Sequence, residues 1–208
     1  DERFPMLNRD VLTDKDLTAV LAQHSETNAV ATLALYPVED PSAYGLVRRN
    51  ANNSVSEFLE KPSPEQIDTN LINAGAYVLE RTVLDSMPPA GTNVSIERDV
   101  FPALVGHGLF GYAASGYWLD IGTPDRYLQA TFDILAGEVE TEIGSAIAAA
   151  GGELADGAAV DGEVIAPALI ARGATVAAGA TVGPYAVLEA GAEVGEGATV
   201  TRAAVLSG

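Results

Sequence analysis

Two carboxylates of the 208-residue chain follow short apolar runs, at the position where a buried strand would end. Asp10 follows the run that begins at Phe4, and Asp120 follows Tyr117-Trp118-Leu119. Ligands of open α/β sheets bind beyond the carboxyl ends of strands, and carboxylate oxygens are ligands that Mg²⁺ prefers. Asp10 and Asp120 are therefore candidate Mg²⁺ ligands, and for Asp10 an ordinary turn at a strand end is the alternative.

A third candidate group adjoins another apolar run, in Phe58-Leu59-Glu60-Lys61-Pro62. Lys61 is one of only two lysines among 11 basic residues. A lysine ammonium is a compact point charge that suits a phosphate. Neighbours on a strand face opposite sides, so Glu60 and Lys61 can meet directly only where the strand ends. Lys61 is a candidate phosphate ligand, and a solvated charge pair is the alternative.

The fourth candidate group lies inside an apolar run, Ile72-Asn73-Ala74-Gly75-Ala76-Tyr77-Val78. An amide and a glycine weaken the interior of a strand, so their presence needs a reason. Gly75 would let a sugar approach the backbone, and Asn73 would hydrogen-bond its hydroxyl groups. A β-bulge at the glycine is the alternative interpretation.

The elements that must position these residues follow from periodicity and caps. Apolar spacing predicts a helix over residues 16–25, with Asp14 or Asp16 as its cap and with Leu17, Val20 and Leu21 on one helical face. A continuous apolar run predicts a buried strand over residues 29–38, and further strands are predicted over residues 55–59 and 71–79. Together they indicate an α/β protein with a mainly parallel sheet that is covered on both faces.

Two further helices carry clear start signals. Ser95 can cap a short helix that runs through Val100. Thr123 is a cap followed by a proline and an acidic residue, and that helix is expected to run through Leu135 and to stop at Gly137.

The second half of the chain contains an internal repeat with a period of six residues. Branched apolar residues recur at Val164, Ile170, Val176, Val182, Leu188, Val194, Val200 and Leu206, and an alanine follows each of the first seven by four positions. This period fits neither an α-helix nor an isolated strand. It predicts a hexapeptide solenoid in which each branched residue points inward and stacks on the residue 18 positions later. Glycines at the corners, Gly173, Gly179, Gly191 and Gly197, supply permissive backbone angles.

Composition excludes several classes of function. The net charge of −18 repels phosphate backbones and anionic lipid, so nucleic-acid and membrane-surface partners are not expected. The absence of cysteine excludes thiolate metal sites and cysteine nucleophiles, and it suits a cytoplasmic protein. No apolar run approaches the roughly 20 residues of a membrane span.

Six motifs in order resemble those of the nucleotidyltransferases that make nucleotide-sugars, and most closely the mannose-1-phosphate guanylyltransferases. Many members of the family carry a C-terminal left-handed β-helix after these motifs, so the resemblance covers essentially the whole chain. The motifs are Asn8-Arg9-Asp10, Tyr44-Gly45, Phe58-Leu59-Glu60-Lys61-Pro62, Asn73-Ala74-Gly75-Ala76-Tyr77, the stretch from Ser95 to Pro102, and Tyr117-Trp118-Leu119-Asp120-Ile121-Gly122-Thr123-Pro124.

The resemblance implies a role for each candidate residue. Asp10 and Asp120 would hold the catalytic Mg²⁺, and Lys61 would contact the sugar phosphate. The sugar would be bound by Asn8, Gly45, Glu60, Asn73 and Gly75. The implied reaction is attack of a sugar-1-phosphate oxygen on the α-phosphorus of a nucleoside triphosphate, with GTP favoured, and release of pyrophosphate.

The resemblance also implies a domain organisation. Residues 1–137 would be a partial Rossmann-like nucleotidyltransferase domain, residues 138–163 a linker with an irregular first coil, and residues 164–208 a left-handed parallel β-helix of hexapeptide repeats. The open ends of such a β-helix favour a homo-oligomer.

Two departures from the family pattern bear on activity. The glycine-rich triphosphate loop of the family and its following Pro-Lys-Pro are absent from this sequence, and Arg9 replaces the glycine of Asn-Gly-Asp. Arg9 could crowd the metal site or pair with Asp10. We therefore expect no transferase activity from this chain alone, and pyrophosphate release with Mg²⁺, GTP and mannose-1-phosphate is the assay.

Two rival interpretations remain at this point. A non-catalytic regulatory or scaffold homologue would keep the fold and lose turnover. A hexapeptide acyltransferase would place a general-base histidine on the repeat. Both histidines, His24 and His107, precede the repeat, and we expect each to be a surface residue.

Overall fold

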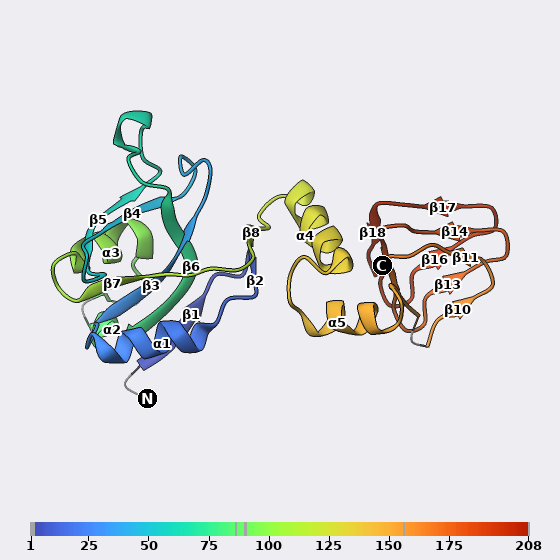
Figure 1. The fold of residues 1–208 in the computed structure, drawn as a ribbon, viewed down its shortest axis with the longest axis horizontal. Helices are drawn as coiled ribbons and strands as arrows, with labels where there is room; N and C mark the ends of the chain where they lie inside the picture. The colour runs from blue at the N-terminus through green and yellow to red at the C-terminus, as the bar shows by residue number, and fades with distance from the viewer. Residues whose placement is uncertain (1–2, 86, 90, 156, 208) are drawn as a thin grey trace. The chain divides into compact units, whose positions relative to one another are not determined.

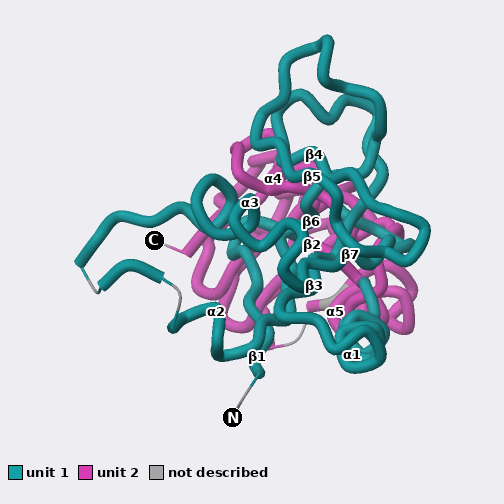
Figure 2. Tube along the Cα trace, turned by 90° about the vertical axis from the view of Figure 1, so that its left-hand side faces the viewer, with its two compact units in different colours: residues 1–11, 15–118 teal, residues 12–14, 119–208 magenta. Residues whose placement is uncertain are grey.

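The structure is a computed structural model that describes residues 3–85, 87–89, 91–155 and 157–207. It divides into two compact units. Unit 1 comprises residues 1–11 and 15–118, and unit 2 comprises residues 12–14 and 119–208 (Figure 2). Each unit is described by itself.

Unit 1 is built on a six-stranded mixed sheet (Figure 1). The strand order is β5-β4-β6-β3-β7, with β1 also paired to β6. Every pairing in this sheet is antiparallel except β3 with β7. The strands are β1 (Arg3–Leu7), β3 (Ala31–Pro37), β4 (Gly45–Arg49), β5 (Val55–Glu60), β6 (Leu71–Glu80) and β7 (Leu109–Ala113).

The α/β organisation predicted from the sequence is confirmed, but the mainly parallel sheet is wrong. Strand β6 is ten residues long and pairs antiparallel with three neighbours, β1, β3 and β4. Because burial on both faces produces continuous apolar runs whichever way the neighbouring strand runs, the pattern of β3 and β6 did not reveal their relative direction.

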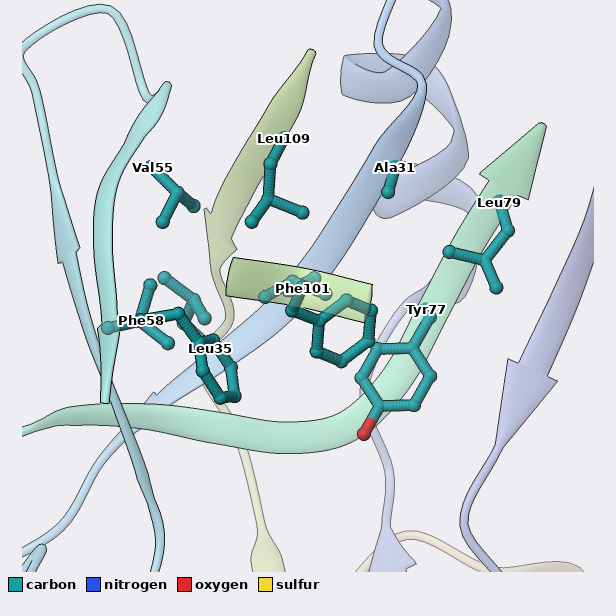
Figure 3. Packing of buried hydrophobic residues seen from close by; sticks show 10 residues of the cluster. Ala31, Leu35, Val55, Phe58, Tyr77, Leu79, Phe101 and Leu109 are labelled. Atoms are coloured by element: carbon teal, nitrogen blue, oxygen red, sulfur yellow. The ribbon is translucent and has the colours of Figure 1, made fainter. Parts of the chain in front are cut away.

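Helices cover both faces of this sheet, as predicted. On one face Val20 of α1 (Leu17–Glu26) packs against Ala34, Ala74 and Val78. On the other, Phe101 packs against Tyr77 and Phe58 at ring-centroid distances of 5.0 and 5.4 Å (Figure 3). Phe101 opens α3 (Phe101–Leu104), which continues the π-helical turn η2 (Ile96–Val100). Unit 1 also contains η1 (Pro64–Gln66) and α2 (Thr82–Asp85).

Helix α1 begins at one of its two predicted caps. Asp16 is its N-cap and accepts a hydrogen bond from the Thr18 amide at 2.8 Å. Of the three apolar residues predicted to share one helical face, Val20 is buried, whereas Leu17 and Leu21 are 38% and 42% exposed. Both line an apolar cavity of about 380 Å³ between β1 and α1. The helix therefore buries a narrower stripe than its apolar residues span.

Unit 2 contains two helices followed by short parallel strands. Helix α4 (Pro124–Ala136) is capped by Thr123 and ends at Gly137 in the left-handed conformation, as predicted. Helix α5 (Glu142–Ala149) lies within residues 138–163, where a linker and irregular coil were expected. Its N-cap, Thr141, accepts from the Gly144 amide, and this cap was missed in the sequence. Strands β2 (Val11–Thr13) and β8 (Trp118–Asp120) form a separate two-stranded sheet.

The repeat forms three narrow parallel sheets, β10-β13-β16, β11-β14-β17 and β9-β12-β15-β18. Val176 pairs with Val194 and Val182 with Val200, each 18 residues later, as the period of six predicts. The strands are β9 (Glu153–Leu154), β10 (Ala159–Val160), β11 (Glu163–Val164), β12 (Ala168–Ile170), β13 (Thr175–Val176), β14 (Thr181–Val182), β15 (Ala186–Leu188), β16 (Glu193–Val194), β17 (Thr199–Val200) and β18 (Ala203–Val205).

The inward positions of the repeat are buried for most of its length. Ile170, Val176, Val182, Leu188 and Val194 form one apolar cluster with the alanines between them. The corner residues Gly173, Gly179, Gly191 and Gly197 have φ angles of +78°, +73°, +76° and +72°, which explains their identity.

The last predicted inward residue, Leu206, is a correction. Strand β18 pairs with β15 one residue early, so Val205 rather than Leu206 lies opposite Leu188. Val205 packs against the apolar cluster of the repeat, whereas Leu206 is 57% exposed. This shift in register changes which residue points inward, because a shift of one residue moves a side chain to the other face of a strand. Within the described ranges, no helix is both long enough and apolar enough to span a bilayer.

Candidate functional site

Strand pairing in unit 1 assembles three of the sequence motifs at one place. Gly45, the first residue of β4, lies opposite Glu60, the last residue of β5. On its other side β4 pairs with β6, where Leu46 lies opposite Ile72, next to Asn73. The Lys61 amide donates to the Tyr44 carbonyl at 3.0 Å, which extends the β4–β5 pairing by one residue. Residues 44–45, 60–61 and 73–75 are therefore neighbours.

Gly45 has a steric reason for being glycine. A Cβ at this position would lie 2.7 Å from Phe58 Cζ and 3.1 Å from Glu60 Oε2. Phe58 is itself held in the core against Phe101. A side chain at position 45 would therefore displace both the core ring and the Glu60 carboxylate.

Glu60 and Lys61 stand in contrasting environments. The Glu60 side chain is half-buried, and this burial raises the pKa of its carboxyl group. The negative charge of Glu97 raises the pKa further, while Lys61 and Arg98 act in the opposite direction. Lys61 follows the end of β5, is exposed and has a φ of +52°. Among the described residues, the Lys61 ammonium makes no ion pair within 4 Å, so it can meet an incoming phosphate.

Asn73 is held by the chain in one orientation. Its Oδ1 accepts from the Gly75 amide at 3.2 Å, and its Nδ2 donates to the Tyr77 hydroxyl at 2.9 Å. Because a backbone amide can only donate, the oxygen of the side chain must face Gly75. One N–H and one lone pair of the Asn73 amide remain, which is what a sugar hydroxyl needs in order to donate and accept at once.

Gly75 lies in a β-bulge, the alternative that the sequence had left open. Leu33 and Leu35 of β3 pair with Tyr77 and Asn73, so more residues of β6 than of β3 occupy this stretch. Gly75 has a φ of +75°, and a Cβ there would lie 3.1 Å from both Cβ and Nδ2 of Asn8. The Asn8 amide donates to the Gly75 carbonyl at 2.8 Å. The bulge therefore joins two of the predicted sugar-binding residues.

Asp10 lies beside this group, in the turn that follows β1. It lines an open depression of about 550 Å³ together with Leu7, Asn8 and Arg9. Asp10 and Arg9 are both exposed, and within the part of the chain that the structure describes they form no ion pair with each other. The Asp10 carboxylate is therefore not neutralised by the arginine that departs from the family motif.

Asp120 belongs to unit 2. Its Oδ1 accepts from the Gly122 amide at 2.8 Å, and its Oδ2 lies 3.5 Å from Arg126 Nη1. Over the described ranges, no group of three or more histidine, aspartate or glutamate side chains is arranged to hold a metal ion. Of the predicted site residues, unit 1 contains Asn8, Asp10, Gly45, Glu60, Lys61, Asn73 and Gly75.

The prediction that both histidines are surface residues is wrong for His24. His24 is fully buried, with Nδ1 at 2.9 Å from Thr32 Oγ1 and Nε2 at 3.1 Å from Glu80 Oε1. Glu80 also pairs with Arg3. These partners satisfy both ring nitrogens, so a structural role explains His24. His107 is exposed, as expected.

Three residues of the site lay within the motifs but received no role from sequence reasoning. Tyr77 is buried, its hydroxyl orients Asn73, and burial raises its pKa. Glu97, from η2, acts electrostatically on both Glu60 and Tyr77. Trp118 donates its indole N–H to the Ala74 carbonyl at 2.9 Å. The signal in the sequence that could have identified such residues is a polar group inside an apolar run, because a buried polar group needs a hydrogen-bond partner.

Comparisons with known proteins give the following matches. A family model described as nucleotidyl transferase matches residues 1–137. A mannose-1-phosphate guanylyltransferase of Mycobacterium tuberculosis is 38% identical over 183 residues, which is 86% of this chain and 48% of that protein. A probable mannose-1-phosphate guanylyltransferase 1 of Oryza sativa is 34% identical over 207 residues, covering 99% of this chain and 53% of that protein.

Two other matches are a relative that is named for a different substrate and a solved structure with a similar fold. A UTP–glucose-1-phosphate uridylyltransferase of Synechocystis is 37% identical over 67% of this chain and 37% of that protein. The chain thus spans about half or less of the length of these relatives. The crystal structure of HddC from Yersinia pseudotuberculosis shares the fold, with a TM-score of 0.50 and 23% identity over 62% of this chain and 54% of that chain.

Proposed function

The chain belongs to the nucleotidyl transferase family, as its motifs predicted, and from this we propose that unit 1 carries the sugar-phosphate end of a sugar-1-phosphate nucleotidyltransferase site. The observation that carries the proposal is the pairing of Gly45 with Glu60 beside Asn73. This pairing supports the proposal because Glu60, Lys61 and Asn73 are neighbours in the sheet, and a carboxylate, an ammonium and an amide suit the hydroxyls and the phosphate of a sugar-1-phosphate.

Each group has a distinct task in the proposed reaction. Lys61 attracts the phosphate as a point charge, and Glu60 and Asn73 hydrogen-bond the sugar hydroxyls. An oxygen of the sugar phosphate then attacks the α-phosphorus of a nucleoside triphosphate. The new P–O bond forms as the bond to the β-phosphate breaks, and the electron pair leaves with pyrophosphate. Such a reaction depends on alignment and charge neutralisation more than on a general base.

We infer that Asp10 and Asp120 hold Mg²⁺ in the whole protein. Both offer carboxylate oxygens, the donors that this ion prefers, and Asp10 is exposed and unpaired with Arg9. When bound, Mg²⁺ neutralises phosphate charge. Asp120 Oδ2 pairs with Arg126 Nη1 at 3.5 Å, so a cation bound at Asp120 would compete with this ion pair.

For the nucleotide and the sugar we propose GTP and mannose-1-phosphate, with GDP-mannose as the product. The support is that relatives at 34–38% identity are named mannose-1-phosphate guanylyltransferases. The uridylyltransferase relative makes UTP with glucose-1-phosphate the competing pair. Comparing mannose-1-phosphate with glucose-1-phosphate in one binding experiment separates the two sugars.

We further propose that residues 164–208 form a left-handed parallel β-helix that serves assembly, after a catalytic region at 1–137 and a connecting region at 138–163. The repeat of 18 residues between paired strands supports a triangular coil.

The direct test is titration of the chain with mannose-1-phosphate, glucose-1-phosphate and inorganic phosphate by calorimetry. We expect mannose-1-phosphate to bind more tightly than phosphate, because Glu60 and Asn73 add contacts to the sugar. Lys61→Ala should weaken all three ligands, and Asn73→Ala should weaken only the sugar phosphates, each by about tenfold for one charged or neutral hydrogen bond.

The matched control is Arg81→Ala, which removes an exposed cation that follows β6. It should leave all three affinities unchanged. Equal losses for Lys61→Ala and Arg81→Ala would show only general attraction by cations, and would contradict the proposed phosphate contact. Equal affinity of the wild-type chain for phosphate and for both sugar phosphates would contradict a sugar site.

A further inference from the structure

Trp118 contacts both strand segments that border the proposed sugar site. Its indole N–H donates to the Ala74 carbonyl at 2.9 Å. Ala74 lies between Asn73 and Gly75, so this hydrogen bond holds the backbone of the bulge from the face of the sheet that α1 covers. Trp118 is also the only tryptophan in the chain.

The ring of Trp118 is fixed by two tyrosines. Tyr44 meets it edge-on at 5.5 Å with an interplanar angle of 77°, and Tyr36 packs at 5.6 Å. Tyr36 in turn lies under the Lys15 ammonium, 4.1 Å from the ring centroid, and Lys15 donates to the Ser115 carbonyl. The indole is therefore held between the residue that precedes Gly45 and the backbone of residues 73–75.

We propose that Trp118 is a positioning residue that sets the spacing between the Tyr44–Gly45 segment and the Asn73–Gly75 bulge, and so selects for the sugar rather than for the phosphate. The inference deepens the proposed function and rests on it for its ligand. Trp118 acts through the Ala74 carbonyl and the Tyr44 ring and does not itself contact the substrate.

Sugar binding and phosphate binding should respond differently to Trp118. Hydrogen bonds from Asn73 and Glu60 to hydroxyl groups need correct distances and angles, so a shift of the bulge weakens them steeply. Lys61 meets the phosphate with a flexible side chain and a point charge, which tolerates a small displacement. Loosening Trp118 should therefore lower affinity for the sugar phosphate more than affinity for phosphate.

The first readout needs no ligand. Replacing Trp118 with Phe, or with its isostere benzothienylalanine, removes the N–H and keeps an aromatic ring. We expect amide hydrogen exchange to become about tenfold faster at Gly75 and Asn8, which corresponds to the loss of one hydrogen bond. These amides donate to Asn73 Oδ1 and to the Gly75 carbonyl.

The control is Tyr112→Leu, which removes a ring from the same apolar cluster and keeps the Trp118 side chain that donates to the Ala74 carbonyl. It should lower global stability and leave exchange at Gly75 and Asn8 near the wild-type rate once that change is subtracted. Unchanged exchange in both Trp118 variants, or the same increase in the control, would overturn the proposal. The benzothienylalanine variant preserves the ring volume, so it decides the matter if Trp118→Phe folds poorly.

The second readout is selectivity. In both Trp118 variants, calorimetry should show about a tenfold loss of mannose-1-phosphate affinity, the cost of one mispositioned hydrogen bond, and less than a twofold change for inorganic phosphate. Equal losses for the two ligands would mean a general structural role and would overturn the selectivity claim. A wild-type chain that binds no sugar phosphate would contradict the proposed function, while the exchange measurement would still decide the role of Trp118.

Discussion

At the scale of single residues, the site separates charges that the sequence places side by side. Glu60 is half-buried and faces Gly45 across the ladder, whereas Lys61 lies beyond the strand end and is exposed. A chain with a net charge of −18 can still attract a phosphate here, because the nearby Lys61 and Arg98 act locally while distant charges are screened by salt.

We expect the Glu60 carboxylate to lower the folding stability of the chain while it strengthens the binding of mannose-1-phosphate. Burial raises the pKa of Glu60, so between about pH 4.3, the ordinary value, and the raised value the folded chain holds a proton that the unfolded chain has released. Folding stability therefore falls as the pH rises through this window, and it stays lower at neutral pH. Glu60→Gln should unfold at a higher urea concentration than the wild type at about pH 7, and this difference should shrink towards about pH 4.

The same substitution should weaken binding of mannose-1-phosphate by about ten- to a hundredfold, the range for a hydrogen bond to a charged group. Glu39→Gln, an exposed carboxylate in the loop after β3, is the matched control and should change neither property. Urea unfolding at several pH values and calorimetry measure both effects. A Glu60→Gln variant that is less stable at neutral pH, or that binds as the wild type does, would contradict this account.

At the scale of elements, the bulge in β6 is the feature that turns a core strand into part of a site. Gly75→Ala should destabilise unit 1 by more than the approximately 1–2 kcal/mol that a left-handed backbone costs an ordinary residue, since atoms of Asn8 and Val11 lie 3.1 Å from the new Cβ. The control is Gly106→Ala, whose φ of +79° is similar but whose Cβ would meet nothing within 4 Å.

Urea unfolding of the two glycine variants isolates the close contact from the backbone cost. We expect an excess of about 1 kcal/mol or more in Gly75→Ala, because overpacking forces neighbours to move. Mannose-1-phosphate affinity should fall only in that variant. Equal destabilisation by both substitutions would show that the approach of Asn8 contributes nothing.

Secondary-structure elements were predicted correctly where nearby residues alone determine where the element begins. Asp16, Ser95 and Thr123 each cap a helix as expected, because a cap is set by the residue and its next few neighbours. The direction of β6 against β3 was not predicted, because it depends on connections and partners outside the strand. His24 was misplaced for the same reason. It lies four residues after buried Val20 on one helical face, but Thr32 and Glu80 become its partners only in the folded sheet.

In the candidate site, too, residues with a local sequence signal were identified, whereas residues that depend on tertiary contacts were not. Glu60, Lys61, Asn73 and Gly75 were identified from residue types inside apolar runs, and unit 1 does place them together. Tyr77 and Trp118 were not assigned, because each acts through a contact across the bulge that has no signature in sequence spacing. The metal-binding role of Asp10 and Asp120 stays a prediction.

At the scale of the whole molecule, the two units have separate apolar cores. The core residues of unit 1 gather around Phe101 and Tyr77 (Figure 3), and those of the repeat around Val182 and Leu188. Each coil of the repeat contacts mainly the next one, so its stability is approximately a sum over neighbouring coils. Damage to one coil should therefore remain within unit 2.

Substitutions of Leu188 and Leu206 test both this expectation and the shift in register. The period of six predicts that both side chains point inward. Leu188 is fully buried, and Leu188→Ala should lower the free energy of unfolding of unit 2 by about 2–5 kcal/mol through lost burial and a cavity. Leu206→Ala should change it by less than about 0.5 kcal/mol, because Val205 occupies the inward position instead. Amide exchange in β13–β17 should accelerate only for Leu188→Ala, and exchange in β3 and β6 should be unaffected by either variant.

Similar losses of unfolding free energy for Leu188→Ala and Leu206→Ala would mean that the hexapeptide register continues unbroken through Leu206. Faster exchange in β3 and β6 would mean instead that the two units unfold as one.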